Sequence, residues 1–264
     1  MKIVVCIKQV PDTVEVKIDP KTGTLIRDGV PSIINPDDKT GIEAALQLKE
    51  KMAGSTVTVV SMGPPQADVA LREALAMGCD EAILVSGREF GGSDTYATSG
   101  ILAAALKTLD YDVIITGRQA IDGDTAQVGP QIGEKLSLPQ VSYVEDIQEV
   151  AADHLVVRRQ FEDGYHIIKI KTPCLLTAIA ELAQPRYMSV RGVVEAYEKD
   201  IKVLGFEDLK DNLELDMIGL KGSPTNVYQS FTKEVKGAGT ILKDLSAEQA
   251  VKAIVDKLEE KFII

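Results

Sequence analysis

Short runs of apolar residues alternate with amphipathic segments over the first two-thirds of the chain. The apolar runs predict buried strands at residues 3–7, 57–61, 82–85 and 113–116. The amphipathic segments predict helices at residues 37–52, 66–76 and 95–109, and a further helix from about residue 127. Turns are expected at Asp19-Pro20 and Thr22-Gly23. Because continuous valine and isoleucine runs separated by helices are typical of parallel sheets, we expect an α/β fold with a doubly wound, mostly parallel sheet, helices on both faces and right-handed crossovers.

The pattern changes at residue 141, where the apolar runs become shorter and several alternate with polar residues. The predicted strands here are residues 141–150, 155–161, 166–170 and 175–179. Asp163-Gly164, between two of these runs, favours a tight hairpin turn. We therefore expect an antiparallel extension of the same sheet.

Beyond residue 183 glycine and proline interrupt the pattern, and a helix is predicted only at residues 246–262. That helix opens with the capping box Ser246-Ala247-Glu248-Gln249, in which the first and last side chains bond each other's backbone. The residues before it have little core of their own. This segment is either an arm that packs on another chain or a loosely structured tail, and the sequence leaves both interpretations open.

The composition is ordinary for a globular protein, with 45% apolar and 26% charged residues in a chain of 264. The formal net charge of −11 argues against nucleic acid and anionic membrane surfaces as partners, because both require clustered lysine and arginine. No apolar run approaches the roughly 20 residues of a membrane-spanning helix, and the first residues begin a strand rather than a signal peptide. Three scattered cysteines, Cys6, Cys79 and Cys174, indicate neither a disulfide framework nor a metal site. We therefore expect a cytoplasmic protein without membrane insertion.

The most informative segment is the loop that follows the strand at residues 113–116. It reads Gly117-Arg118-Gln119-Ala120-Ile121-Asp122-Gly123-Asp124-Thr125-Ala126-Gln127-Val128. Loops at the carboxyl ends of parallel strands bind ligands in open α/β sheets, and glycines and helix-opening N–H groups suit a phosphate. Asp122 and Asp124 would repel a phosphate, so we expect them to cap the helix or to bond hydroxyls. An ordinary strand-to-helix turn stays the alternative, because the segment is neither a Walker loop nor a GxGxxG motif.

Other segments follow the remaining predicted parallel strands and should meet at the same edge of the sheet. They are residues 6–13, 61–65 and 86–95, together with residues 35–38 at the start of the first helix. Asn35 is interpreted either as a helix cap or as a contact to adenine or ribose, and Cys6 as an inert small hydrophobe. Turn chemistry explains each segment alone, but their number at one edge favours a nucleotide. Neither a nucleophile–base motif nor a metal motif accompanies them, so any chemistry must come from a bound cofactor.

Several segments, in order along the chain, match the motifs of one known family. They are residues 4–10, Asn35-Pro36, and residues 74–80, 117–122, 156–164, 171–178 and 185–192. Together they resemble the small (beta) subunit of electron transfer flavoproteins over nearly the whole chain. The resemblance implies a heterodimer in which a larger alpha subunit carries an electron-shuttling FAD and both chains share a doubly wound fold.

The family has two branches, which differ in the nucleotide that the beta subunit holds. In the common branch the resemblance implies a structural AMP. In the electron-bifurcating branch it implies an FAD that takes a hydride from NADH and sends one electron to ferredoxin or flavodoxin. The other electron passes through the alpha-subunit FAD to a dehydrogenase, of acyl-CoA or lactate type. Residues 91–99, Gly123 and Thr125-Ala126 resemble the bifurcating branch, which we expect here.

Two other interpretations stay open. In the first, Ser93-Asp94-Thr95 merely caps a helix, and the chain is a non-bifurcating beta subunit with AMP. In the second, from another class, the chain is an adenine-nucleotide sensor or adenylating enzyme, which would leave the segment after residue 183 without a purpose.

The resemblance also implies roles for individual residues. The adenosine would be surrounded by Cys6 (through its backbone), Asn35, Asp38, Val59 and Ser61. Apart from the resemblance, the strained turn at residues 61–65, which contains Gly63, suits packing of its backbone flat against a ring. The ribose and phosphates would be held by Gly117, Arg118, Gln119, Ala120, Asp122, Gly123, Asp124, Thr125, Ala126, Gln127 and Val128. The flavin would be approached by Asp94, Thr95 and Thr98. No side chain is implied as catalytic, and the chain is expected to act as an electron-transfer subunit.

Residues 185–192 resemble the partner-recognition loop of the family. The docking residues implied are Arg186, Tyr187, Val190, Arg191 and Val193, with Val190 as the apolar anchor. One departure is Gln160, where some relatives carry a carboxylate that tethers the mobile domain, so that restraint is in doubt here. The chain would then divide into an α/β nucleotide-binding domain, residues 1–183, and a partner-recognition loop with a C-terminal arm, residues 184–264.

Overall fold

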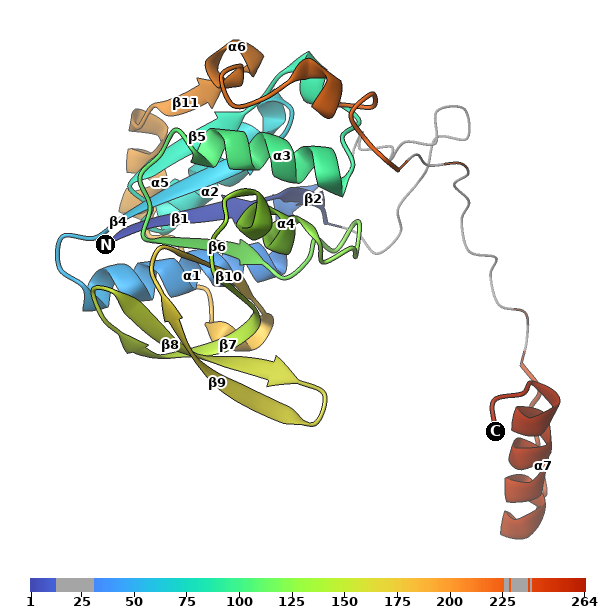
Figure 1. The fold of residues 1–264 in the computed structure, drawn as a ribbon. Helices are drawn as coiled ribbons and strands as arrows, with labels where there is room; N and C mark the ends of the chain where they lie inside the picture. The colour runs from blue at the N-terminus through green and yellow to red at the C-terminus, as the bar shows by residue number, and fades with distance from the viewer. Residues whose placement is uncertain (13–30, 226–227, 229–236, 238) are drawn as a thin grey trace.

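A nine-stranded sheet forms the centre of the computed structural model, which describes residues 1–12, 31–225, 228, 237 and 239–264 (Figure 1). The strand order is β11-β5-β4-β1-β6-β10-β7-β8-β9. The parallel strands are β1 (Lys2–Ile7), β4 (Thr56–Met62), β5 (Glu81–Val85), β6 (Val113–Gly117), β10 (Cys174–Ala178) and β11 (Ile201–Leu204). Strand β7 (Gln140–Val150) pairs in parallel with β10 and antiparallel with β8 (His154–Phe161), and β8 pairs antiparallel with β9 (Gly164–Lys171). Strands β2 (Gln9–Pro11) and β3 (Ser32–Ile34) form a separate antiparallel pair.

Helices cover both faces of the sheet, because successive strand residues are apolar and point to opposite sides. On β1, Ile3 and Val5 pack against the helices of one face, and Val4 packs against those of the other. The first face carries α1 (Pro36–Lys51), α2 (Asp68–Met77) and α5 (Val190–Glu198). The second carries α3 (Thr95–Leu106), α4 (Val128–Lys135) and α6 (Phe206–Leu209). The predicted doubly wound α/β fold is confirmed.

Short 3-10 helices connect several of these elements. They are η1 (Pro65–Ala67), η2 (Arg88–Phe90), η3 (Ala180–Leu182) and η4 (Leu215–Met217). The first of them takes the start of the helix predicted at residues 66–76, so that α2 begins only at Asp68. The turns expected at Asp19-Pro20 and Thr22-Gly23 lie outside the described residues.

The antiparallel extension is smaller than predicted. Strands β8 and β9 form the expected hairpin, with Phe161 opposite Gly164 across the turn at Asp163. Strand β10, however, lies in the parallel part of the sheet, between β6 and β7, so the antiparallel assignment of residues 175–179 is wrong. All five residues of β10 are buried, which is the property of a central parallel strand rather than of an alternating one.

Residues 184–264 contain more structure than the sequence predicted. The expectation that no helix precedes residue 246 is wrong, because α5 lies in this segment. Strand β11 then pairs with β5 at the edge of the main sheet, so residues 201–204 belong to the α/β fold. Both elements are short, and α5 buries only Ala196, which explains why the apolar pattern was weak.

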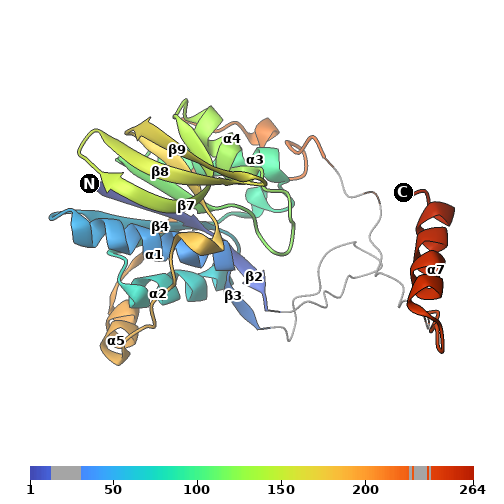
Figure 2. The ribbon, with the colours of Figure 1, turned by 90° about the horizontal axis from the view of Figure 1, so that it is seen from below.

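The last helix, α7 (Ala247–Glu260), begins with the predicted capping box, in which the hydroxyl of Ser246 accepts the N–H of Gln249. Both views show it apart from the sheet (Figures 1 and 2), and none of its residues is buried. Whether it packs on another chain stays a prediction. Within the described part of the chain, no helix combines the length and the apolar character that a membrane span requires.

Candidate ligand-binding site

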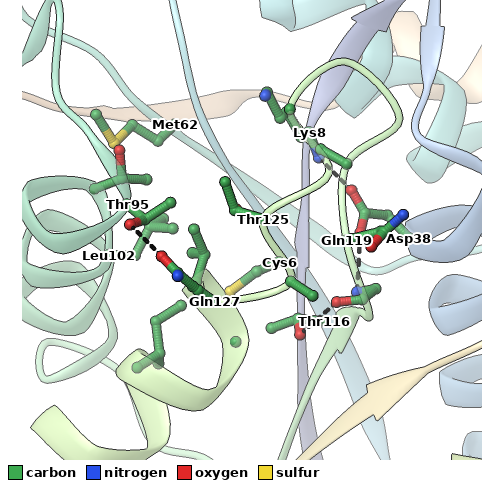
Figure 3. A pocket seen from close by; sticks show the side chains of 18 of the residues that line it. Cys6, Lys8, Asp38, Met62, Thr95, Leu102, Thr116, Gln119, Thr125 and Gln127 are labelled. Atoms are coloured by element: carbon green, nitrogen blue, oxygen red, sulfur yellow. Dashed lines mark hydrogen bonds between the residues drawn. The ribbon is translucent and has the colours of Figure 1, made fainter. Parts of the chain in front are cut away.

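A cavity of about 420 Å³ lies at the carboxyl ends of β1, β4 and β6 (Figure 3). The structure brings the following predicted site residues together in its lining: Cys6, Asp38, Asp94, Thr95, Thr98, Gly117, Arg118, Gln119, Ala120, Gly123, Thr125, Ala126, Gln127 and Val128. These residues come from β1, α1, the start of α3, and the loop between β6 and α4. The volume is in the range of small-molecule sites. The cavity thus lies at the edge of the sheet where the sequence predicted a ligand site, and the binding roles of its residues stay a prediction.

Two buried polar side chains hold the loop after β6 in place. Asp38, which is 7% exposed, accepts the backbone N–H of Lys8 at 2.7 Å and that of Gly117 at 2.9 Å. Asn35 is fully buried; its amide donates to the carbonyl of Gln119 at 2.8 Å and accepts the N–H of Ile121 at 3.0 Å. Asn35 makes no side-chain cap on α1, so that interpretation is wrong. Both side chains shape the loop through its backbone.

The two aspartates of the loop do not cap α4, so that alternative is wrong: the N-cap residue is Gln127, and it makes no side-chain cap bond. Asp122 instead pairs with the Nζ atom of Lys8 at 2.7 Å, and Asp124 accepts from the amide of Gln119 at 3.0 Å. Neither residue lines the cavity. Because both carboxylates are bonded within the chain and lie outside the lining, they repel a phosphate in the cavity less than free carboxylates in the lining would.

Residues 125–127, at the end of the loop, line the cavity and belong to a tight curl of the backbone. Asp124 and Ala126 have φ angles of 49° and 52°, in the left-handed region, so the chain curls tightly before α4. Among the described residues, no backbone or side-chain acceptor bonds the N–H groups of Thr125, Ala126 or Gln127. Unpaired N–H groups in such a curl, next to a helix N-terminus, form a site for an anion. The residues present therefore fit the phosphate of a nucleotide.

The start of α3 forms the wall next to the end of this loop. The carboxylate of Asp94 caps this helix by accepting the N–H of Ala97 at 3.0 Å, so this segment does cap a helix, whether or not it also contacts a cofactor. Thr95 and Thr98 nevertheless line the cavity, and the hydroxyl of Thr95 donates to Oε1 of Gln127 at 2.9 Å (Figure 3). Capping and cavity lining are thus performed by the same turn.

Burial controls the ionisation of two side chains in the lining. Desolvation raises the pKa of Asp38 to about 7, although hydrogen bonds from Lys8, Asn35 and Gly117 oppose the rise. Burial also raises the pKa of the Cys6 thiol to about 12, so it stays neutral at pH 7. The interpretation of Cys6 as an inert hydrophobe is consistent with this state.

Positive charge at the cavity is already paired within the chain. Arg118 lies 3.4 Å from Asp37 and faces the ring of Tyr143, and Lys8 is paired with Asp122. Each cation keeps an exposed part, 35% of the Arg118 side chain and 45% of that of Lys8. Arg118 and Lys8 can therefore offset the negative charge of a phosphate, and neither cation is buried without a counter-charge. Among the described residues, no cluster of His, Cys, Asp or Glu could hold a metal ion.

Some predicted residues lie outside the lining, and some lining residues were not predicted. Those outside it are Asn35, Val59, Ser61, Gly63, Asp122 and Asp124. Val59 and Ser61 are fully buried within β4. The unpredicted members are Ile7, Lys8, Met62, Ser93, Leu102, Thr116, Gly129 and Ile132. Most lie at the ends of β1, β4 and β6 or on α3 and α4. Nothing in the sequence distinguishes the apolar ones from residues of the core.

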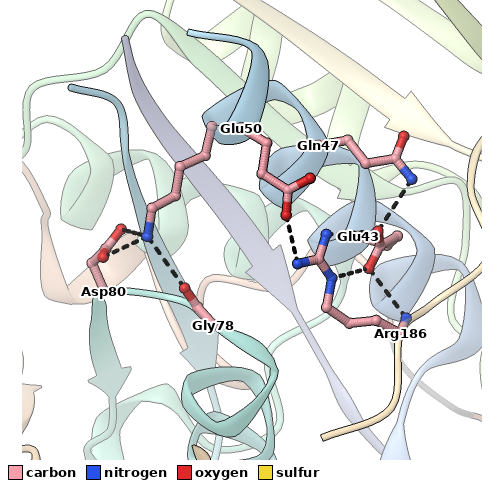
Figure 4. Close-up of polar contacts among 7 residues, drawn as sticks. Glu43, Gln47, Glu50, Gly78, Asp80 and Arg186 are labelled. Atoms are coloured by element: carbon pink, nitrogen blue, oxygen red, sulfur yellow. Dashed lines mark hydrogen bonds and ion pairs between the residues drawn. The ribbon is translucent and has the colours of Figure 1, made fainter. Parts of the chain in front are cut away.

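The predicted docking residues lie just before α5 or within its first four residues, and none of them lines the cavity. Arg186 is bound within the chain: its guanidinium forms a two-bond pair with Glu43 at 2.8 and 2.9 Å and contacts Glu50 at 2.8 Å (Figure 4). Tyr187 and Val190 are 100% and 85% exposed, and Val193 is 39% exposed. Arg191 pairs with Glu195 one turn further along α5. Gln160, the predicted departure, is exposed on β8.

Comparison with known proteins identifies relatives over the whole chain. A model of the electron transfer flavoprotein domain matches residues 22–209. The electron transfer flavoprotein subunit beta of Clostridium acetobutylicum is 57% identical over 264 residues, covering 100% of both chains. The caffeyl-CoA reductase-Etf complex subunit CarD of Acetobacterium woodii is 53% identical over 265 residues. The acryloyl-CoA reductase electron transfer subunit gamma of Anaerotignum propionicum is 53% identical over 271 residues. Both matches cover 100% of this chain and 100% of the relative.

The fold and the cavity define an open α/β protein with a ligand pocket at the carboxyl edge of a doubly wound sheet. The chain belongs to the electron transfer flavoprotein family, and its similarity there is to beta-type subunits of electron transfer complexes.

Proposed function

We propose that this chain is the beta subunit of a heterodimeric, electron-bifurcating electron transfer flavoprotein and that its cavity binds FAD. The observation that carries the proposal is that one cavity is lined both by the loop after β6 and by the start of α3. The backbone donors of residues 125–127 suit a phosphate, and Thr95 and Thr98 belong to the neighbouring wall, where Thr95 bonds Gln127. A dinucleotide uses both walls, whereas AMP needs only the first.

This chain's own residues would bind and orient the cofactor. The loop from Gly117 to Val128 would hold the phosphates, and the apolar side chains of Met62 and Leu102 would exclude water beside the ring system. When bound, FAD supplies the hydride and single-electron chemistry that no side chain of the lining can perform. NADH as donor, ferredoxin or flavodoxin as one acceptor, and a cytoplasmic location belong to the same proposal.

The second part of the proposal concerns the partners. Two relatives are named as a subunit of the caffeyl-CoA reductase-Etf complex and as an electron transfer subunit of acryloyl-CoA reductase. We infer that this chain pairs with an alpha subunit and serves a flavin dehydrogenase of acyl-CoA or lactate type. The exposed apolar side chains of Tyr187, Met188 and Val190, close together in the sequence, support docking there, because grouped apolar side chains mark protein interfaces whereas single ones do not.

The test is the cofactor content of the complex. The chain is co-purified with its alpha subunit, the complex is denatured, and FAD and AMP are quantified by chromatography. About two FAD per heterodimer without AMP supports the proposal, since the alpha subunit holds only one. One FAD and one AMP would instead assign the protein to the non-bifurcating branch, in which this chain is a scaffold with a docking surface.

A further inference from the structure

The cavity wall at the start of α3 is bonded to residues 218–225, which we call the arm root because the C-terminal segment continues from them. One carboxylate oxygen of Asp94 caps α3 through the N–H of Ala97 at 3.0 Å. The other accepts the N–H of Thr225 at 3.0 Å and its hydroxyl at 2.7 Å. Asp94 also lines the cavity. A single side chain therefore belongs to the cavity wall, the helix start and the arm root.

Two serines add further bonds between the same segments. The N–H of Asp94 donates to the hydroxyl of Ser223 at 2.9 Å, and that hydroxyl, in a residue only 8% exposed, donates to the carbonyl of Gly219 at 2.6 Å. The hydroxyl of Ser93 accepts the N–H of Gly219 at 3.0 Å. The residues that precede α3 and the arm root are thus joined through both backbone and side-chain groups.

The fit between the two segments is also tight in space. A Cβ atom on Gly92 would lie 2.5 Å from Leu220, and one on Gly219, whose φ is +63°, would lie 2.5 Å from the carbonyl oxygen of Glu89. Ile218, 2% exposed, packs in the same apolar cluster as Phe90. The arm root cannot shift without moving residues 89–94, because close-packed groups transmit displacement rather than absorb it.

Asp94 is poorly suited to contact a nucleotide itself. Burial acts to raise the pKa of its carboxyl, but hydrogen bonds from Ala97 and Thr225 hold it below the usual range, so the group stays ionised. Both of its oxygens already accept bonds from the chain. An ionised carboxylate with these bonds acts on a ligand through the groups that it holds, which are the first turn of α3 and the arm root.

We propose that Asp94 is a positioning residue that couples ligand binding in the cavity to the order of the arm root through Thr225. This inference rests on the proposed function only in that the ligand is FAD or AMP. A ligand that contacts Thr95 and Thr98 fixes the first turn of α3, and the bonds of Asp94 carry that restraint to residues 218–225. The coupling is reciprocal: whatever fixes the arm root raises the affinity of the cavity for its ligand.

The test is hydrogen exchange of the full-length chain with and without saturating FAD or AMP. In the wild type, ligand should slow exchange of the amides of residues 218–223 and of Thr225 by about tenfold, within the usual range of coupling between sites. Thr225→Val removes one bond to Asp94 and leaves the cavity lining intact. Asp94→Asn keeps the helix cap and places an amide N–H₂ against the N–H of Thr225. Thr225→Val, at a residue outside the cavity lining, should still bind the ligand, and both variants should show less than about twofold protection of the arm root.

The matched control is Ser189→Ala, which removes the side-chain cap of α5, whose hydroxyl accepts the N–H of Gly192. Ser189→Ala should lower the free energy of unfolding about as much as Thr225→Val does, and it should leave the tenfold protection of the arm root in place. Wild-type protection in both Asp94→Asn and Thr225→Val overturns the coupling, as does ligand binding by the wild type without any protection. A chain that binds neither FAD nor AMP overturns the proposed function as well, so the two failures are distinguishable.

Discussion

The hydroxyl of Thr95 donates a 2.9 Å hydrogen bond to Oε1 of Gln127, and this contact joins the first residue of α3 to the N-cap residue of α4 across the cavity. The two residues lie 32 positions apart in the sequence. Both helices pack on the same face of the sheet, so their first turns are held at a fixed spacing. The width of the cavity is thereby set by two side chains that also line it.

The first prediction concerns the donors of the loop after β6. Replacing Thr125 and Gln127 together with valine and leucine removes two polar side chains from the lining. Hydrogen bonds to charged groups contribute about 1.5–3 kcal/mol each, so nucleotide affinity should fall at least about 100-fold. Titration of the purified chain measures this, and co-purification should show that the alpha subunit still binds. Thr108→Val, in the turn after α3, is the control. Full retention of nucleotide in the double variant contradicts the assignment.

The second prediction compares two glycines of the same loop. A Cβ on Gly117 would lie 2.2 Å from Oδ1 of Asp38, whereas one on Gly123 would meet nothing within 4 Å. Gly117→Ala should therefore lower the free energy of unfolding by about 2–3 kcal/mol, the cost of overpacking a buried site. Gly123→Ala should change it by less than about 0.5 kcal/mol. Urea denaturation decides; equal effects would show that Asp38 does not constrain the loop.

The third prediction follows from the raised pKa of Asp38, about 7 in the folded chain. The folded state binds a proton here that the unfolded state releases near pH 4, so stability from this residue is highest at low pH and falls as the pH rises to about 7. Asp38→Asn does not titrate. The difference in unfolding free energy, wild type minus variant, should decrease between pH 4 and 7 and stay constant above. A difference that rises over this interval would contradict the assignment.

Much of the fold was predictable because its signals are local. The buried strands of the parallel sheet are continuous apolar runs, and the capping box at Ser246 is a short motif. The position of β10 in the sheet could not be predicted in the same way. The neighbours with which a strand pairs are determined by contacts between residues far apart in the sequence. Strand β11 was missed because only Leu204 of its four residues is buried.

The site was predictable at the level of loops but less so for single side chains. Glycines and hydroxyls after successive strands indicated the edge where the cavity lies. Sequence could not tell that Asn35 and Asp38 would turn their polar atoms onto the backbone of residues 117–121, because that depends on how the loop folds over α1. Nor could it tell that Arg186, predicted for docking, is bound to α1.

The fourth prediction concerns that arginine. The Glu43 side chain is 5% exposed, and although burial acts to raise its pKa, hydrogen bonds from Arg186 and Gln47 hold the pKa below the usual value. Arg186→Met would leave the Glu43 carboxylate buried without its partner, which costs about 3–5 kcal/mol in fully buried pairs. Because 35% of the Arg186 side chain is exposed, we expect about 2 kcal/mol here.

The double variant Arg186→Met with Glu43→Leu separates the ion pair from the side-chain contacts, since it leaves no buried charge. It should recover most of the stability lost in Arg186→Met.

Because the pKa of Glu43 is lowered in the folded chain, the contribution of the pair should be present at neutral pH and be lost as the pH falls below about 4. Arg186→Met should also weaken docking of the dehydrogenase while nucleotide binding is unchanged, because the pair fixes the residues that lead to Tyr187 and Val190. A variant that keeps wild-type stability and docking would show that α1 does not position this surface.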